Sequence, residues 1–371
     1  MNFLIITNVE HTQLENQFFG YSPYVREMNL WIKNCKKVTI VAPIAKQHPT
    51  EIDVNYKHQN IDFIAVKSFN FLNFKNSIKS IFYFPMLFFK IFKAMKSADH
   101  IHLRCPGNMG LLGCLVQVFF PSKQKTAKYA GNWDIKSQKP LSYKLQQYIL
   151  NNTLLTQNMQ VLVYGQWPRS SKNIKPFFTA TYSQNEIEII PEKSVKSKIK
   201  FVFVGMLVHG KNPLYAILII ENLAKKSIDV SLCFYGDGVL KNELMTYVQQ
   251  KNLSKTVSFQ GNQPKDILKK AYQESHYVIL PSVSEGWPKA VAEAMFWGCV
   301  PIATVVSCVP DMLNFGERGI LLSLNLKNDI QSILKLVKNN IDFLSKSNLA
   351  KKWSQQFTTD KFESEIKNLL L

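Results

Sequence analysis

Two series of short hydrophobic runs, rich in β-branched residues, alternate along the chain with longer segments of helical periodicity. The first series is Phe3–Thr7, Val38–Pro43, Ile61–Val66, His100–Arg104, Thr126–Tyr129 and Val161–Tyr164. The second is Lys200–Val204, Val230–Tyr235, Val257–Gln260, Tyr277–Leu280 and Val300–Thr304. Strands that alternate with helices form parallel sheets covered by helices on both faces. The pattern therefore predicts an α/β protein with two Rossmann-like parallel-sheet domains.

A polar segment separates the two series. Residues Tyr182–Lys198 are rich in Glu, Lys and Ser and include Pro191. We therefore expect an N-terminal domain over residues 1–185, a linker over 186–198 and a C-terminal domain over 199–345. A chain of 371 residues has the length of about two ordinary domains. The last segment, 346–371, is expected to be helical and to cross back to the N-terminal domain.

The composition adds a strong positive charge. There are 45 Lys and Arg against 26 Asp and Glu, a formal net charge of +19, which favours anionic partners. The basic residues are spread along the chain and the aromatic residues mostly lie in apolar runs, so we do not expect a nucleic-acid partner.

The six cysteines form no Cys-x-x-Cys pair, which indicates free thiols. Without a secretory signal or an 18-residue apolar run, the chain is expected to be cytoplasmic.

One segment combines basic and aromatic residues. Ser77–Lys96 reads SIKSIFYFPMLFFKIFKAMK and is expected to be a helix. It would lie on the inner face of the cell membrane if its lysines, at positions 79, 90, 93 and 96, contact lipid phosphates. Alternatively, it is a core helix whose lysines extend to the solvent. The sequence leaves both interpretations open.

Candidate chemistry is concentrated in the second half, where a strand ends before Pro281. Pro288 suits the start of a helix and Gly286 permits a tight turn before it. Amides at such a helix start face the carboxyl edge of the sheet, where ligands of parallel sheets bind. The carboxylates of Glu285 and Glu293 could accept hydrogen bonds from sugar or ribose hydroxyls. Alternatively, Glu293 forms a solvated i,i+4 pair with Lys289.

A second turn has the outline of an anion site. After strand Lys200–Val204, the chain runs from Gly205 to Lys211, and Pro213 then begins a helix. A basic side chain at a glycine-containing turn between a strand and a helix can neutralise a phosphate. Lys211 is therefore a candidate ligand for a diphosphate.

Taken together, these motifs resemble the nucleotide-binding domain of family 4 retaining glycosyltransferases, which have the GT-B fold. The resemblance covers residues Phe201 to Leu322. The matching motifs are Gly205…Lys211, Gly236-Asp237-Gly238, Phe259-Gln260-Gly261, Ser284-Glu285-Gly286-Trp287-Pro288…Glu293-Ala294-Met295 and Trp297–Thr304. The resemblance implies two domains facing a central cleft.

The resemblance also implies roles for individual residues. Lys211 would hold the donor diphosphate and Glu293 the ribose hydroxyls, while Gly205, Gly236 and Gly261 belong to the donor-binding turns. The transferred sugar would be held by Glu285 together with the amides of Gly286, Trp287 and Pro288. Lys211 and the helix-start amides would stabilise charge on the leaving nucleotide diphosphate. Members of the family use no metal or other cofactor and retain the anomeric configuration.

The sequence departs from the family pattern at two turns. Met206 follows Gly205 where most relatives have Arg, so one phosphate contact would be lost or supplied from elsewhere. A glycine-rich turn is replaced by Val305-Val306-Ser307-Cys308, which precedes the expected Val309-Pro310-Asp311.

The N-terminal half matches the family less closely. Arg104 stands where relatives have an active-site His, and it would bind a phosphate or an acidic acceptor, or else form a structural ion pair. His102 is expected to point into the core. Asn108, Trp133 and Asp134 follow strands and are candidate acceptor ligands, since sugar sites combine flat rings with polar groups.

The resulting hypothesis is a retaining glycosyltransferase that uses a nucleotide-diphosphate sugar, with UDP favoured over GDP. Its catalytic residues would be Glu285, Lys211 and Arg104, and its acceptor a glycan or a lipid-linked glycan in cell-surface polysaccharide synthesis. Two alternatives stay open: another GT-B enzyme such as a nucleotide-sugar epimerase, and a non-catalytic protein that binds anions or nucleic acid.

Overall fold

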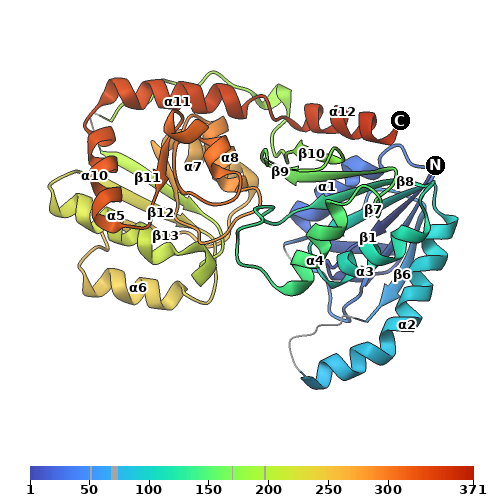
Figure 1. The fold of residues 1–371 in the computed structure, drawn as a ribbon. Coiled ribbons are helices and arrows are strands. Elements are labelled where there is room, and N and C mark those ends of the chain that lie inside the picture. Colours follow the sequence, from blue (N-terminus) through green and yellow to red (C-terminus); the bar gives the residue numbers. More distant parts are fainter. Residues whose placement is uncertain (51, 68–73, 169, 196–197) are drawn as a thin grey trace. The chain divides into compact units, whose positions relative to one another are not determined.

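The computed structural model describes residues 1–50, 52–67, 74–168, 170–195 and 198–371, and of residues 74–83 only the backbone. The chain forms two compact units. Unit 1 comprises Met1–Phe177 together with Glu363–Leu371, and unit 2 comprises Phe178–Phe362. Figure 1 shows a sheet flanked by helices in each unit. The predicted α/β class is confirmed.

Unit 1 contains a seven-stranded parallel sheet in the order β10-β9-β8-β7-β1-β4-β6. Its strands are β1 (Asn2–Ile6), β4 (Lys37–Pro43), β6 (Ile61–Val66), β7 (His100–Cys105), β8 (Gln124–Tyr129), β9 (Met159–Tyr164) and β10 (Ile174–Phe177). The strands that the hydrophobic runs predict are all present. The edge strand β10 was not predicted, because its four residues include Lys175 and Pro176 and form no hydrophobic run.

Helices cover both faces of this sheet, as the alternation of side chains along β1 requires. Leu4 and Ile6 pack in one core with α2 (Phe74–Ser97), α3 (Asn108–Val116) and α4 (Leu141–Leu150). Phe3 faces the other way and stacks on Trp31 of α1 (Ser22–Ile32), with the ring centroids 6.1 Å apart. A short 3-10 helix, η1 (Gln117–Phe119), follows α3.

A small antiparallel sheet occupies the segment in which no element was predicted. It consists of β2 (His11–Leu14), β3 (Gln17–Tyr21) and β5 (Asp53–Asn55). His11 is buried and its Nε2 lies 2.9 Å from the hydroxyl of Tyr56. Burial lowers the pKa of His11 to about 4. The strands are three to five residues long, and β2 and β5 are mostly polar, so they carry little hydrophobic signal.

Unit 2 contains a six-stranded parallel sheet in the order β13-β12-β11-β14-β15-β16. Its strands are β11 (Ile199–Val204), β12 (Val230–Tyr235), β13 (Val257–Phe259), β14 (Tyr277–Leu280), β15 (Val300–Thr304) and β16 (Ile320–Leu322). The helices are α5 (Pro213–Lys225), α6 (Lys241–Gln250), α7 (Lys265–Glu274), α8 (Lys289–Phe296), α9 (Val309–Met312), α10 (Leu326–Val337) and α11 (Asn340–Ser354). The last helix, α12 (Thr359–Leu370), begins in unit 2, and its residues from Glu363 onward belong to unit 1. Turns of 3-10 helix occur at η2 (Gln184–Glu186), η3 (His209–Lys211) and η4 (Asn314–Gly316). The three-residue edge strand β16 was not predicted.

The six cysteines are free, as their spacing predicted. Within the ranges that the structure describes, no helix is both long and apolar enough to span a bilayer.

Lys193 fixes the segment that enters the sheet of unit 2. Its ammonium group donates hydrogen bonds to the carbonyl oxygens of Tyr272 (2.8 Å), Ser275 (2.6 Å) and Trp297 (2.8 Å). These carbonyls lie at the C-terminal ends of α7 and α8, where a helix lacks intrahelical donors. Desolvation lowers the pKa of Lys193. One side chain therefore satisfies two helix ends at once.

We predict that Lys193→Met destabilises unit 2 by about 2–3 kcal/mol, because three carbonyl oxygens lose a charged donor. Urea unfolding followed by circular dichroism measures this loss. The matched control is Lys198→Met, since Lys198 belongs to the same segment and is exposed. Equal stability of the two variants would show that the three hydrogen bonds contribute nothing.

Candidate active site

The order of the strands in unit 2 defines where a ligand can bind. β11 lies between β12 and β14, so the connections that leave β11 and β14 depart toward opposite faces of the sheet. Such a reversal opens a crevice at the carboxyl ends of the two strands, where open α/β sheets bind their ligands. Lys211 follows β11 and Glu285 follows β14. The topology therefore brings the two main candidates to one place.

Lys211 and Glu285 form an ion pair at this point. Lys211 Nζ lies 2.5 Å from Glu285 Oε1, and the two side chains are 25% and 7% exposed. The backbones of the two turns also meet, because the amide of Val283 donates to the carbonyl of Gly210 at 2.9 Å. The two turns thus form one structure with a cation and a carboxylate in contact.

The predicted donor-site glycines hold three neighbouring turns together. A Cβ at Gly236 would lie 2.0 Å from the carbonyl oxygen of Gly205, so only glycine fits there. The amide of Gly236 donates to the carbonyl of Gly261 at 2.7 Å. Gly236 has a φ of 138°, a conformation that side chains disfavour. Backbone contacts at Gly205, Gly236 and Gly261 therefore join the turns that follow β11, β12 and β13.

The turn that carries Glu285 is held by a neighbouring loop. The carbonyl of Gly286 accepts hydrogen bonds from Ser307 Oγ (3.0 Å) and Cys308 Sγ (3.2 Å). Pro288 is the N-cap of α8, so the helix proper begins at Lys289. The expectation that an amide of Pro288 contacts the sugar is wrong, because proline has no N–H.

Glu293 takes no part in the ion pair and has partners of its own. Its carboxylate accepts hydrogen bonds from Thr181 Oγ1 (2.7 Å) and the hydroxyl of Tyr272 (3.2 Å). Burial raises the pKa of Tyr272 well above its ordinary value, so this hydroxyl is a stable donor. A ribose bound to Glu293 would have to displace or share the bond with Thr181. The ribose role stays a prediction.

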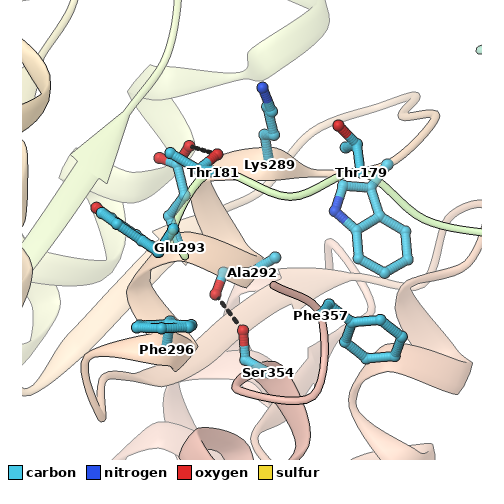
Figure 2. A pocket seen from close by; sticks show the side chains of 10 residues that line it. Thr179, Thr181, Lys289, Ala292, Glu293, Phe296, Ser354 and Phe357 are labelled. Carbon is cyan, nitrogen blue, oxygen red and sulfur yellow. Dashed lines mark hydrogen bonds between the residues drawn. The ribbon is translucent and has the colours of Figure 1, made fainter. Parts of the chain in front are cut away.

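Glu293 also lines a small hollow, shown in Figure 2. The Thr181–Glu293 hydrogen bond borders it, as does the bond from Ser354 Oγ to the carbonyl of Ala292 (2.6 Å). The hollow has room for about one water molecule, roughly 10 Å³.

Trp287 and Trp353 stack next to this hollow, with their ring centroids 6.1 Å apart. The guanidinium carbon of Arg318 lies 5.1 Å from the centroid of Trp353. Trp353 therefore supports Trp287, the residue that follows the Glu285-Gly286 turn.

Unit 1 places Arg104 in a buried charge cluster. Arg104 Nη1 lies 2.8 Å from Glu27 Oε1, and Lys128 Nζ lies 3.0 Å from the same oxygen. Burial acts to lower the pKa of Arg104, but Glu27, Tyr164 and Tyr24 together outweigh it and the pKa is raised. Of the two interpretations, the structure bears out the ion pair, while the catalytic role of Arg104 stays a prediction. His102 is fully buried, which confirms its predicted place in the core.

Sequence reasoning missed Glu27 and Lys128. Glu27 lies on a helix and Lys128 in a strand, and only their shared burial marks them, with side chains 6% and 1% exposed. A lysine inside the predicted strand Thr126–Tyr129 is the one signal that could have drawn attention to Lys128.

The candidate acceptor residues have different positions. Trp133 is 1% exposed and packs edge-on against Tyr129 at 4.9 Å, so the expectation that its ring stacks on an acceptor is wrong. The loop around it folds back into the hydrophobic core. Asp134 accepts a hydrogen bond from the amide of Lys136 (2.9 Å) and closes a turn. Asn108 begins α3 at the carboxyl edge of the sheet, and its acceptor role stays a prediction.

Among the residues that the structure describes, no group of three or more His, Cys, Asp or Glu side chains could hold a metal ion. The metal-independent reaction that the family resemblance implies stays a prediction.

Comparison with known proteins identifies the family. Residues 185–358 match the family model of glycosyl transferases group 1. The capsular polysaccharide biosynthesis glycosyltransferase CapH of Staphylococcus aureus is 25% identical over 281 residues, which are 71% of this chain and 76% of CapH. An Escherichia coli enzyme, UDP-Gal:alpha-D-GlcNAc-diphosphoundecaprenol alpha-1,3-galactosyltransferase, is 30% identical over 47% of this chain and 46% of its own length.

A solved structure shows the same fold over the whole chain. HepE from Anabaena, in complex with UDP-glucose, superposes with a TM-score of 0.69 at 12% identity, covering 100% of this chain and 99% of HepE. The structure thus has the GT-B fold, and the family match together with CapH shows that the chain is a glycosyltransferase. Residues 185–358 belong to the glycosyl transferases group 1 family.

We predict that Gly236→Ala destabilises unit 2 by about 2 kcal/mol or more, because the new methyl group collides with the Gly205 carbonyl. The matched control is Gly210→Ala, since a Cβ at Gly210 meets no atom within 4 Å. Its stability should stay within about 0.5 kcal/mol of the parent protein. Urea unfolding compares the two variants, and a tolerated Gly236→Ala would contradict the role of this close approach.

Proposed function

We propose that this protein transfers a sugar from a nucleotide-diphosphate sugar to a glycan or lipid-linked acceptor, with retention of the anomeric configuration. The observation that supports it most is the contact of Lys211 with Glu285 at the strand-order reversal of unit 2. Two charged groups lie side by side there. The Lys211 ammonium can neutralise a diphosphate, and the Glu285 carboxylate can accept hydrogen bonds from sugar hydroxyls. The donor lies, on this proposal, across both turns.

The chemistry follows from the charge that develops during transfer. As the bond to the sugar breaks, negative charge accumulates on the leaving diphosphate. Lys211 and the main-chain amides of the Glu285–Trp287 turn would stabilise this charge without having to reorganise. The acceptor hydroxyl would attack from the face that the leaving group vacates, and a phosphate oxygen of the donor would take its proton. The family resemblance supports this retaining course.

The donor and the acceptor are proposed from the relatives. The E. coli relative is named for UDP-Gal and a diphosphoundecaprenol-linked acceptor, and CapH for capsular polysaccharide biosynthesis. We infer UDP in preference to GDP as the nucleotide, and a cell-surface polysaccharide as the product. Arg104, 18% exposed at the end of β7, would offer a cation to an anionic acceptor.

We predict that a UDP-sugar raises the melting temperature of the protein, and that Lys211→Ala and Glu285→Ala each weaken its binding about tenfold or more, because each removes a charge-assisted contact. A thermal-shift and hydrolysis screen with UDP-glucose, UDP-N-acetylglucosamine, UDP-galactose and GDP-mannose measures both effects.

The matched control for that screen is Lys200→Ala. Lys200 also pairs with a glutamate, Glu274 at 3.1 Å, but it stands at the opposite end of β11. Its variant should bind the donor as the parent does. If the two site variants keep the parent's response to every nucleotide sugar, the donor-site assignment fails.

We also propose that unit 1 rests on the inner face of the cell membrane through α2. Leu87 and Ile91 are buried, whereas Met86 and Phe89 are 44% and 69% exposed. Lys90, Lys93 and Lys96 are exposed as well, and positions 86, 89, 90 and 93 share one face of a helix. An outward face that combines apolar side chains with lysines is typical of helices that lie on anionic lipid. Lys79 and the other side chains up to position 83 lie outside the described residues.

The lysines of α2 should control binding to acidic membranes. We expect the protein to co-sediment with phosphatidylglycerol vesicles and not with phosphatidylcholine vesicles. Lys90→Gln/Lys93→Gln/Lys96→Gln should weaken that binding about 100-fold or more, since three lysines at about 1 kcal/mol each contribute about 3 kcal/mol. A triple variant of three exposed lysines in unit 2, Lys327→Gln/Lys335→Gln/Lys338→Gln, removes the same charge. An equal loss in both triple variants would overturn the assignment of α2.

A further inference from the structure

The loop after β15 contains two side chains that bind the same backbone atom. Ser307 Oγ and Cys308 Sγ both donate to the carbonyl oxygen of Gly286, at 3.0 and 3.2 Å. This carbonyl belongs to the turn between Glu285 and α8. Two donors from one loop thus fix one peptide group of another.

The local conformation of Ser307 is unfavourable for a serine. Its φ is 50°, in the left-handed region that glycine adopts most easily. The sequence has Val305-Val306-Ser307-Cys308 where the family resemblance leads one to expect glycines. Glycine would fit the backbone better but has no side chain to donate. The hydroxyl is therefore what a serine adds at this position.

The thiol of Cys308 is protonated and can therefore donate a hydrogen bond. Cys308 is 1% exposed, and burial raises the pKa of its thiol to about 12, with a further contribution from Asp311. The thiol keeps its hydrogen at neutral pH.

The two hydrogen bonds to the Gly286 carbonyl also determine the orientation of the Trp287 amide. The peptide bond between Gly286 and Trp287 is trans, so its C=O and N–H point in opposite directions. Two hydrogen bonds to the oxygen therefore fix the direction of the Trp287 N–H. Preorganised donors of this kind are effective because they need no reorientation when charge develops.

We propose that Ser307 and Cys308 are positioning residues that lock the Gly286–Trp287 peptide beside Glu285 for binding of the transferred sugar. This inference rests on the proposed donor site. The loop after β15 lies outside the Lys211 and Glu285 turns. On this proposal it affects donor binding indirectly, through the carbonyl oxygen of Gly286.

The test compares variants that remove each donor. Ser307→Gly deletes the hydroxyl and relaxes the backbone, Cys308→Ala deletes the thiol, and Cys308→Ser restores a donor of similar size. Val305→Ala is the matched control, since Val305 belongs to the same loop and is 55% exposed. Affinity is measured by isothermal titration with the nucleotide sugar that binds the parent best among UDP-glucose, UDP-N-acetylglucosamine, UDP-galactose and GDP-mannose, and with the corresponding nucleoside diphosphate.

We expect Ser307→Gly and Cys308→Ala each to weaken binding of the nucleotide sugar about 3- to 10-fold, and their combination more. Cys308→Ser and Val305→Ala should stay within about twofold of the parent. Binding of the nucleoside diphosphate alone should change less, because it lacks the sugar. Ser307→Gly should unfold at the same temperature as the parent or higher, which separates positioning from stability.

Two results would overturn the inference. If the parent binds a nucleotide sugar and the double variant Ser307→Gly/Cys308→Ala binds it equally well, the positioning role fails while the donor site stands. Equal weakening of nucleotide sugar and nucleoside diphosphate, together with a lower melting temperature, would show a merely structural role. If the parent binds none of the nucleotide sugars, the donor site fails and this inference fails with it.

Discussion

The ion pair between Lys211 and Glu285 is the contact around which the candidate active site is organised. A carboxylate that is only 7% exposed is unfavourable unless a cation and hydrogen-bond donors compensate for the water it has lost. Lys211 supplies that charge from a different turn. The pair therefore ties the end of β11 to the end of β14, where the sheet order reverses. A diphosphate that enters this point would meet a lysine whose position is already fixed.

Close backbone packing lets the pair form. The turns after β11, β12 and β13 are in direct contact, and the contact between the first two depends on Gly236, where any side chain would collide with the Gly205 carbonyl. On the other side, the amide of Val283 reaches the carbonyl of Gly210. Each turn is thus held by main-chain hydrogen bonds to its neighbours. Lys211 and Glu285, the side chains that we propose carry the chemistry, extend from turns that are held in this way.

The central strands of both sheets could be predicted from the sequence because they are buried on both faces and therefore form continuous hydrophobic runs. The strands that escaped prediction are short and lie at edges or in a small separate sheet, such as β10 and β2. The pairing of Lys211 with Glu285 could be anticipated because both follow strands that end at the same sheet edge. The burial of Trp133 could not, because a loop that folds back into the core has no periodicity to reveal it.

The charge cluster of unit 1 shows why some buried charged residues escape sequence reasoning altogether. Glu27 and Lys128 are separated by more than a hundred positions and meet only in the folded unit 1. Arg104 and Lys128 share one oxygen of Glu27. Removing one partner of such a buried group leaves an uncompensated charge, which is strongly unfavourable. The cluster is therefore held together by the attraction between its own charges. A bound anion would offset part of the remaining positive charge at Arg104, the most exposed of the three members.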